Sequence, residues 1–466
     1  MAKQKKMVIA IVSGHQPEGA GSGVLISAQA KTYVALGYEV HMFVAYHTTN
    51  FKRIPGVIYH LVPFTGEIEP IERIPGAFPT NVMMFTSHTR STANFWDISY
   101  TTAKDYSEHF RKFYEKDFAE INPSIIHSQH CWLTTAITTD FDYPVICTIH
   151  GTDLMGYERS AKELQAINEK LANGDNSEKL LEEKAKYEYY MNMAEKAARN
   201  SKEIWVISHQ QEAKFKELFP FASDKVRLVR NGCDTSIYYN EPTDATAILE
   251  NLESNVTPDK KIPMDYYKLA IFVGKFADFK RVDLVLDAAK IYEEEMAKKG
   301  LKVLTIIAGA GALDAELKAH QAEIGTKNVH FVGRVDANTV RALNNIADVF
   351  LAPSDNEPDG LVYKECMLCG NVAVGTLGGG VPDTINPENI DLTSVVETSE
   401  VYPTPYGVLV PMGDAKSLAA AAMYVFENPD KFDRTKIIEY AKANYDQMNI
   451  SKEIIIPTFE KYAKED

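Results

Sequence analysis

The sequence LAIFVGKFADFKRVDLVLDAAKIYEEEMAKKGLKVLTIIAG, residues 269–309, decides the fold. It begins with an apolar run, continues through a short polar loop, and then shows helical periodicity from Val282 to Gly300 before a second apolar run. Uninterrupted apolar runs of this length are typical of strands buried on both faces of a parallel sheet. The stretch therefore predicts a β-α-β unit with two parallel strands.

The same pattern recurs on both sides of this stretch. Later candidate strands are NVHFVGR, DVFLAP, NVAVGT and YGVLVP, and those of the first half are MVIAIVS, YEVHMFVA, SIIHSQ, PVICTIH, EIWVIS and VRLVRN. A polar stretch rich in proline lies between the two sets of strands and predicts a segment that connects two domains. We therefore predict an α/β protein with two Rossmann-like, doubly wound domains: residues 1–235, a linker at 236–264, a second domain at 265–440, and a C-terminal helix at 441–466 that packs back towards the first domain.

Composition excludes several classes of protein. The 466 residues include 49 Lys and Arg against 64 Asp and Glu, a net charge of -15, which argues against general nucleic-acid binding. Apolar windows are too short for a membrane span, so we expect membrane contact to be peripheral at most. The five cysteines are scattered and odd in number, which favours a reducing, cytoplasmic location over a disulfide framework.

A glycine-rich stretch, EGAGSGV at residues 18–24, lies between the first strand and the first helix. Glycines there, including Gly23, let backbone amides approach a phosphate at a helix N-terminus, although such turns also serve plain strand-to-helix geometry. A nicotinamide dinucleotide site would need an acidic residue at the end of the second strand, and none is present. Dinucleotide binding is therefore disfavoured.

Three cations follow the first strand of the second domain. Lys275, Lys280 and Arg281 lie in GKFADFKR, at the carboxyl end of the strand, where doubly wound sheets bind ligands. The simpler alternative is a solvated basic turn. The placement favours an anion site.

The segment EPDGLVYKECMLCGN, residues 357–371, predicts a helix that begins near Gly360 and ends at Gly370. Glu365 then falls in an apolar stripe, where its carboxylate needs a hydrogen-bonding partner, either a ligand hydroxyl or a group of the protein. Glu357, eight residues earlier, can reach the same place. Two cysteines in this helix lack further ligand partners, so we predict no metal site.

His150 ends the candidate strand PVICTIH of the first domain. A histidine there can donate to a sugar hydroxyl, although a lone histidine is more often structural. His127 and His130 end the preceding strand, but no third ligand with metal-binding spacing accompanies them.

Taken together, these motifs resemble the retaining GT-B glycosyltransferases of family GT4, the glycosyl transferases group 1. The resemblance spans nearly the whole chain and rests on GSGV, IHG, WVIS with VRNGCD, FVGKFADFKR, IAGAGAL, FVGRV, EPDGLVYKE with CGNVAV and GGVPD, and YGVLVPMGD. It implies two domains facing a central cleft, a nucleotide-sugar donor bound mainly by the second domain, and an acceptor bound mainly by the first. The donor is a substrate, so no cofactor is expected.

The resemblance also implies residue roles. Lys275 and Lys280 would hold the donor diphosphate, Glu357 the transferred sugar and Glu365 the ribose. His150 would contact outer hydroxyls of the sugar. The remaining donor contacts would come from Gly23, from Arg334 and Val335 around the base, and from backbone amides of Asp359, Gly360, Leu361 and Val362. The family usually has Arg in place of Lys275 and an apolar residue in place of Asp359, whose carboxylate would select a donor or turn into solvent.

We therefore expect a metal-independent, retaining transfer of a hexose-type sugar from a UDP- or GDP-sugar to a hydroxyl of a small-molecule, glycan or lipid-linked acceptor. The alternatives are a catalytically idle sugar-nucleotide binding protein, or a GT-B epimerase or phosphorylase. Residues 86–112 mix aromatic, hydroxyl and basic groups and are candidate acceptor contacts, or else an ordinary loop and packed helix. Acidic residues interleave the lysines there and favour a soluble acceptor.

Overall fold

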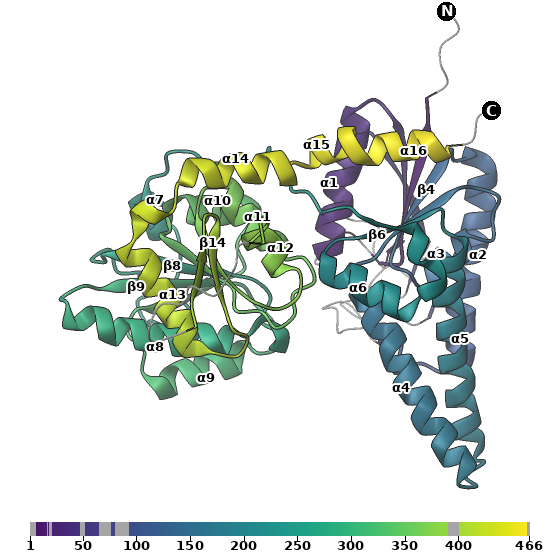
Figure 1. Cartoon of the computed structure of the whole chain (residues 1–466), viewed down its shortest axis with the longest axis horizontal. Helices are drawn as coiled ribbons and strands as arrows, with labels where there is room; N and C mark the ends of the chain where they lie inside the picture. The colour runs from purple at the N-terminus through teal and green to yellow at the C-terminus, as the bar shows by residue number, and fades with distance from the viewer. Residues whose placement is uncertain are drawn as a thin grey trace, which may run out of the picture. The chain divides into compact units, whose positions relative to one another are not determined.

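The computed structural model of the chain describes residues 6–15, 17, 21–46, 52–64, 76–79, 93–389 and 400–463. The chain divides into two compact units (Figure 1). The first contains residues 1–230 and 447–466, and the second contains residues 231–446. The chain therefore changes unit twice, after Arg230 and after Asp446.

The first unit is built on a parallel sheet with seven strands among the described residues, in the order β3-β2-β1-β4-β5-β6-β7. Its strands are β1 Val8–Ser13, β2 Glu39–Tyr46, β3 Val57–Pro63, β4 Ile125–Gln129, β5 Val145–Thr148, β6 Glu203–Val206 and β7 Val226–Leu228. The order reverses between β1 and β4. Sheets of this kind bind ligands beyond the carboxyl ends of the strands at such a reversal.

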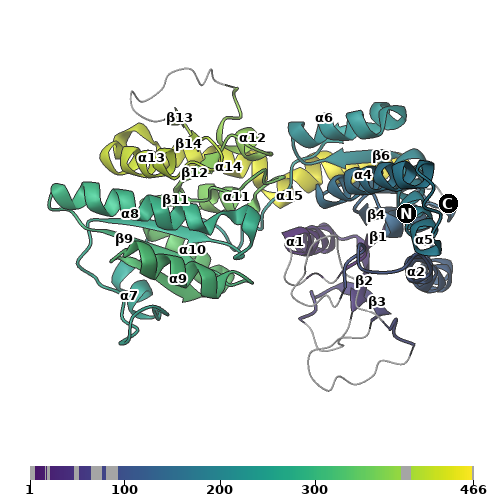
Figure 2. The same ribbon diagram turned by 90° about the horizontal axis from the view of Figure 1, so that it is seen from below.

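Helices cover both faces of this sheet (Figure 2). Alternate residues of β1 point to opposite faces, so that Val12 packs with α2, α3 and α5, whereas Ile11 packs with α1 and the C-terminal helices. The helices are α1 Gly21–Ala35, α2 Tyr100–Ile121, α3 Leu133–Thr138, α4 Thr152–Ala172, α5 Glu178–Asn200, α6 His209–Leu218, and α15 Gln447–Ile450 and α16 Ile456–Tyr462 on either side of the π-helical turn Ser451–Ile455.

The second unit repeats the design. Its described strands form one sheet in the order β10-β9-β8-β11-β12-β14-β13, parallel except for the last pair, with the reversal between β8 and β11. The strands are β8 Lys268–Val273, β9 Val303–Ala308, β10 Val329–Gly333, β11 Val349–Leu351, β12 Val372–Thr376, β13 Tyr402–Thr404 and β14 Gly407–Val410. The predicted pair of Rossmann-like sheets is confirmed.

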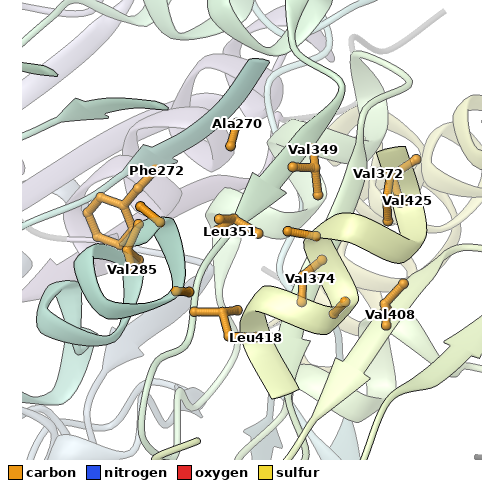
Figure 3. Close-up of a cluster of buried hydrophobic side chains, with 14 of the residues drawn as sticks. Ala270, Phe272, Val285, Val349, Leu351, Val372, Val374, Val408, Leu418 and Val425 are labelled. Atoms are coloured by element: carbon orange, nitrogen blue, oxygen red, sulfur yellow. The ribbon is translucent and has the colours of Figure 1, made fainter. Parts of the chain in front are cut away.

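The core of the second unit lies on both faces of its sheet. Figure 3 shows one face, where Phe272 and Val374 of the strands meet Val285 of α8 and Leu418 of α13. On the other face, Leu343 of α10 packs on Ile271. The helices are α7 Ala245–Glu250, α8 Val282–Lys298, α9 Asp314–Ile324, α10 Ala337–Ile346, α11 Leu361–Leu368, α12 Val381–Ile385, α13 Ala415–Glu427 and α14 Arg434–Tyr445.

The unit limits differ from the predicted domain limits. Residues 236–264, for which the sequence predicts a linker, lie within the second unit. Leu249 of α7 and Ile262 are buried in the core against Leu269 and Ile271 of β8, which explains why the stretch belongs there despite its polar composition. The return to the first unit begins at Gln447 instead of residue 441. Among the described residues, no helix has the length and apolar character needed to cross a membrane.

Candidate functional site

The predicted anion-binding loop begins where β8 ends. It contains Gly274 and Lys275, and a short 3-10 turn, Asp278–Lys280, leads into α8. The loop is packed tightly against the end of β9, because a Cβ atom on Gly309 would lie 1.9 Å from the carbonyl oxygen of Gly274. Only glycine fits this close approach, so the backbone itself holds the loop at the carboxyl edge of the sheet.

Lys280 meets Glu357, which lies in the loop after β11. The Lys280 ammonium donates to the Glu357 carboxylate, and the two side chains are only 16% and 13% exposed. The backbone N–H of Asp355 also donates to the carbonyl of Phe279 at 2.7 Å, which joins the same two loops. Two residues that the sequence assigns to one site, 77 positions apart, are therefore in contact.

This contact lies at the point where ligands are expected. β8 and β11 are neighbours and flank the reversal of strand order in the second sheet. At the reversal, the chain leaves the two neighbouring strands towards opposite faces of the sheet, which leaves room beyond their carboxyl ends. The Lys280 and Glu357 loops both arise there.

Glycines fix the backbone around Glu357. Gly380 N–H donates to the Glu357 carbonyl at 2.8 Å, and a Cβ atom on Gly379 would lie 2.0 Å from the same oxygen. Gly360, at a φ of 70°, begins α11 in the left-handed region that favours glycine. The predicted helix start is confirmed, and the main chain from Glu357 to Gly360 is tightly positioned.

The Asp359 carboxylate is buried and paired with other side chains of the second unit. Its carboxylate accepts from the buried Lys364 ammonium and, at 3.1 Å, from the Asn231 side chain, while Lys364 also donates to the Asn231 carbonyl at 3.2 Å. Burial raises the pKa of Asp359, although Lys364 opposes the shift. The alternative that this carboxylate turns into solvent is therefore wrong, and the backbone of Asp359 remains the part predicted to contact the donor.

Glu365 is 8% exposed on α11, as the apolar stripe predicts. Burial raises the pKa of Glu365 to about 7, and a hydrogen bond from the Tyr238 hydroxyl opposes the shift. A carboxylate in an apolar environment needs such a donor. Tyr238 supplies one, and a ribose hydroxyl could supply another.

The other residues of the second unit that are predicted to contact the donor fall into two groups. Lys275 lies near Arg334, since burial and then the guanidinium of Arg334 lower the pKa of Lys275. Val335 beside it is half-buried. Leu361 and Val362 form the half-buried first turn of α11, immediately after Gly360.

Gly23 and His150 belong to the first unit. A Cβ atom on Gly23 would lie 1.9 Å from the carbonyl oxygen of Pro17, so packing alone requires glycine there. His150 follows β5, is partly exposed, and shares a 2.8 Å hydrogen bond between its Nε2 and the Gln129 Oε1. Burial, and then the neighbouring His130, lower the pKa of His150 well below its usual value.

Sequence reasoning missed the partners of the acidic residues. Asn231 lies in VRNGCD and Lys364 in EPDGLVYKE, but neither was given a role, and Tyr238 lies outside the quoted motifs. The contacts of all three depend on how the chain from residue 231 packs on α11. Lys364 carried one signal, a lysine buried in a mostly apolar helix. Cys366 and Cys369 are buried thiols, and the described residues include no group of three metal-binding side chains.

The candidate acceptor region, residues 86–112, is described only from residue 93. The described part packs within the first unit: Phe95, Tyr106 and Phe110 are buried, and Arg159 lies 4.3 Å above the ring of Trp96. These contacts favour the simpler interpretation of a packed loop and helix. Residues 86–92 lie outside the described residues.

Comparison with curated proteins finds relatives along most of the chain. A D-inositol 3-phosphate glycosyltransferase of Corynebacterium aurimucosum is 23% identical over 81% of this chain and 81% of its own length. A D-rhamnosyltransferase of Pseudomonas aeruginosa, WbpZ, is 29% identical, but that match covers 33% of this chain and 37% of the relative. The chain thus matches well under half the length of some of these relatives.

Solved structures share the fold. Sucrose-phosphate synthase from Thermosynechococcus elongatus superposes with a TM-score of 0.65 and 18% identity, over 98% of this chain and 99% of that one. HepE of Anabaena in complex with UDP-glucose gives a TM-score of 0.62 and 15% identity, over 97% and 100%.

Family comparison accounts for both units. Residues 19–237 match the family described as Glycosyltransferase Family 4, and residues 257–444 match Glycosyl transferases group 1. The chain therefore belongs to the glycosyltransferases of group 1, family 4, and has their GT-B fold.

Proposed function

We propose that this glycosyltransferase moves a hexose-type sugar from a UDP- or GDP-sugar to a hydroxyl group, with retention and without a metal ion. The contact between Lys280 and Glu357 at the strand reversal of the second unit carries the proposal. It places one cation and one carboxylate together, which suits a ligand with a diphosphate beside a sugar hydroxyl. Lys275 adds a second cation in the same loop.

The chemistry of transfer needs this combination. Breaking the bond between sugar and diphosphate builds negative charge on the leaving group and positive charge on the sugar ring. When the donor arrives, the Lys280 ammonium can exchange its Glu357 partner for the diphosphate oxygens. The Glu357 carboxylate is then free to accept from a hydroxyl of the sugar, so each charge keeps a partner.

The relatives support the substrate class. Their names include an inositol 3-phosphate glycosyltransferase and a rhamnosyltransferase, and one structural neighbour was solved with UDP-glucose. Both named activities transfer a sugar. The acceptor of this chain is accordingly a small molecule, glycan or lipid-linked compound that presents a hydroxyl.

Thermal unfolding with a panel of nucleotides tests the proposal. UDP, GDP, ADP and their sugar conjugates are added separately, with EDTA present throughout. A ligand at about 100 times its Kd stabilises the folded state by roughly 2.7 kcal/mol, which raises the unfolding midpoint. We expect a rise with one nucleotide family, and no rise with any of them would contradict a donor site.

Consumption of the donor separates transfer from binding alone. The nucleotide family that raises the midpoint is incubated with the protein as its sugar conjugate, with and without candidate hydroxyl acceptors. Release of the nucleoside diphosphate with a product of unchanged anomeric configuration supports the retaining transferase. Binding without consumption in any mixture would indicate an idle sugar-nucleotide binding protein.

A further inference from the structure

Helices α4 and α5 form a hairpin that extends away from the sheet of the first unit (Figure 1). They contain 21 and 23 residues, so each is roughly 30 Å long at about 1.5 Å per residue. Near the sheet, Glu158 of α4 forms an ion pair with Lys214 of α6 at 2.6 Å. At the far end, every residue of the turn 173–177 is exposed.

One face of this hairpin carries an apolar groove between its two helices. The groove has a volume of about 480 Å³. Leu164 of α4 and Met191 of α5 are half-buried in its lining, and Ala161 and Ala172 lie along the same face of α4. All of its lining residues belong to α4 and α5, so no other described element covers this face.

The side chains along the α4 side of the groove have the layout of a helix contact. The central ones are uncharged and follow at intervals of four, three and four residues, the spacing of one helix face. They are Ala161, Gln165, Asn168 and Ala172. Lys162 and Glu169 are exposed at the margin, and because seven residues are nearly two full turns, both lie on the same flank.

The hairpin is nearly neutral in a strongly acidic chain. Residues 152–200 contain ten Asp and Glu against eight Lys and Arg, a net charge of -2, whereas the whole chain carries -15. Two copies of such an acidic chain repel each other over most of their surfaces. The hairpin is a place where this repulsion is small and where charges of both signs are available.

The charges on the flank of α4 are complementary to those of a second copy. When two identical helices pack antiparallel about a two-fold axis, residue i of one copy faces residue j of the other, and j faces i. With the axis between residues 165 and 166, Lys162 of each copy lies opposite Glu169 of the other. A parallel arrangement would instead set each of these residues against its own equivalent, which places like charges together.

We propose that the α4–α5 hairpin is a self-association surface, on which a second copy of this chain packs its own hairpin antiparallel. The four helices cover Leu164 and Met191 of both copies, and Lys162 and Glu169 form two symmetric ion pairs at the margin. The groove spans about three turns of α4, residues 161–172, so the contact is small and the dimer is reversible. The surface is separate from the donor loops and does not depend on the proposed function.

Sedimentation equilibrium of the full chain tests self-association. The concentration runs from about 1 to 200 µM, which covers micromolar values of Kd. We expect the average mass to rise from the 52.1 kDa of one copy towards twice that value. A mass of 52.1 kDa at every concentration would overturn the proposal.

Charge reversal locates the surface. Lys162→Glu and Glu169→Lys each place like charges opposite one another, so each should raise the Kd of the dimer at least tenfold. The double variant restores opposite charges, and its Kd should return to within threefold of wild type. Lys170→Glu is the matched control, since it makes the same change of charge on the opposite face of α4.

Mixing the two single variants separates a lost contact from a damaged fold. In an equimolar mixture, Glu at 162 of one copy meets Lys at 169 of the other, and both ion pairs form with unlike charges. We expect the mixture to dimerise nearly as well as wild type, although each variant alone does not. Equal Kd values for wild type and both single variants, or no dimer in the mixture, would place the contact elsewhere and contradict the hairpin surface.

Discussion

The two units present opposite chemistry at equivalent places in the same fold. Beyond the strand reversal of the second unit, charged side chains pair with one another, Lys280 with Glu357 and Lys364 with Asp359. Beyond the reversal of the first unit, Gln129 and His130 keep buried side-chain atoms without partners, and burial lowers the pKa of His130. We call the place in the second unit the ionic edge, with Lys280, Glu357, Asp359 and Lys364. We call the place in the first unit the neutral edge, with Gln129 and His130.

The chemistry of each edge suits a different kind of ligand. Paired charges can exchange partners with a diphosphate and a sugar hydroxyl without leaving a charge unpaired. Neutral donors and acceptors suit hydroxyl groups and discriminate against anions. The division is what a transferase needs if a charged leaving group stays in one unit while hydroxyl groups are oriented by the other.

The largest effect should come from breaking the buried pair beneath the ionic edge. Lys364→Met leaves the Asp359 carboxylate buried without its cation, and we expect a loss of about 3–5 kcal/mol in the free energy of unfolding. Urea unfolding measures it. Adding Asp359→Leu should restore most of the loss, because an apolar pair replaces the ionic one. If the single variant is as stable as wild type, the pair does not hold the loop.

Glu357→Gln tests the carboxylate of the ionic edge. The amide keeps the size of the side chain but removes its charge, so turnover should fall at least a hundredfold, about 2.7 kcal/mol, while the fold is kept. Steady-state kinetics with the donor found by the nucleotide panel measure it. Glu316→Gln on the exposed face of α9 is the control. Full activity would remove the sugar-contact role.

The pH dependence of stability tests Glu365. Its folded pKa of about 7 exceeds the ordinary value of 4.5, so the buried carboxyl favours the protonated form. The contribution of Glu365 to the free energy of unfolding is fully present below pH 4.5 and is lost as the pH rises through 7. Between pH 5 and 7 this removes about 2 kcal/mol of stability, which urea unfolding can follow. Glu365→Gln should flatten that part of the curve. An unchanged slope would contradict the raised pKa.

The smallest of these effects concerns the cation of the ionic edge. Lys280→Ala should weaken binding of the preferred nucleoside diphosphate at least tenfold, or about 1.4 kcal/mol, since one of two lysines in the loop is removed. Calorimetry measures it, with Lys298→Ala on the exposed end of α8 as the control. Equal affinity in wild type and variant would remove Lys280 from the diphosphate site.

Much of the ionic edge was predictable because its residues stand in order along short motifs. Lys280 and Glu357 follow the carboxyl ends of two strands, and those strands are neighbours in a doubly wound sheet. Asp359 was misjudged because its partner, Lys364, lies on the next helix and its second partner, Asn231, lies where the chain enters the unit. Contacts between residues far apart in the sequence cannot be predicted from its hydrophobic periodicity.

The neutral edge shows the limit of the same reasoning. The sequence places His130 and His150 after two strands, but it assigns no role to His130 and none to Gln129. Their significance depends on which nitrogen is already hydrogen-bonded and which is buried without a partner.

The sequence by itself determined the two parallel sheets, the helix that begins at Gly360 and the loop that carries Lys280. Hydrophobic periodicity and glycine positions act locally and can be read along the chain. Only the tertiary structure decided that residues 236–264 belong to the second unit, that Asp359 is buried against Lys364, and that the rings of His130 and His150 are neighbours. The physical reason is that burial and pairing depend on what the rest of the chain brings to each side chain, and these fix its charge and its free hydrogen-bonding atoms.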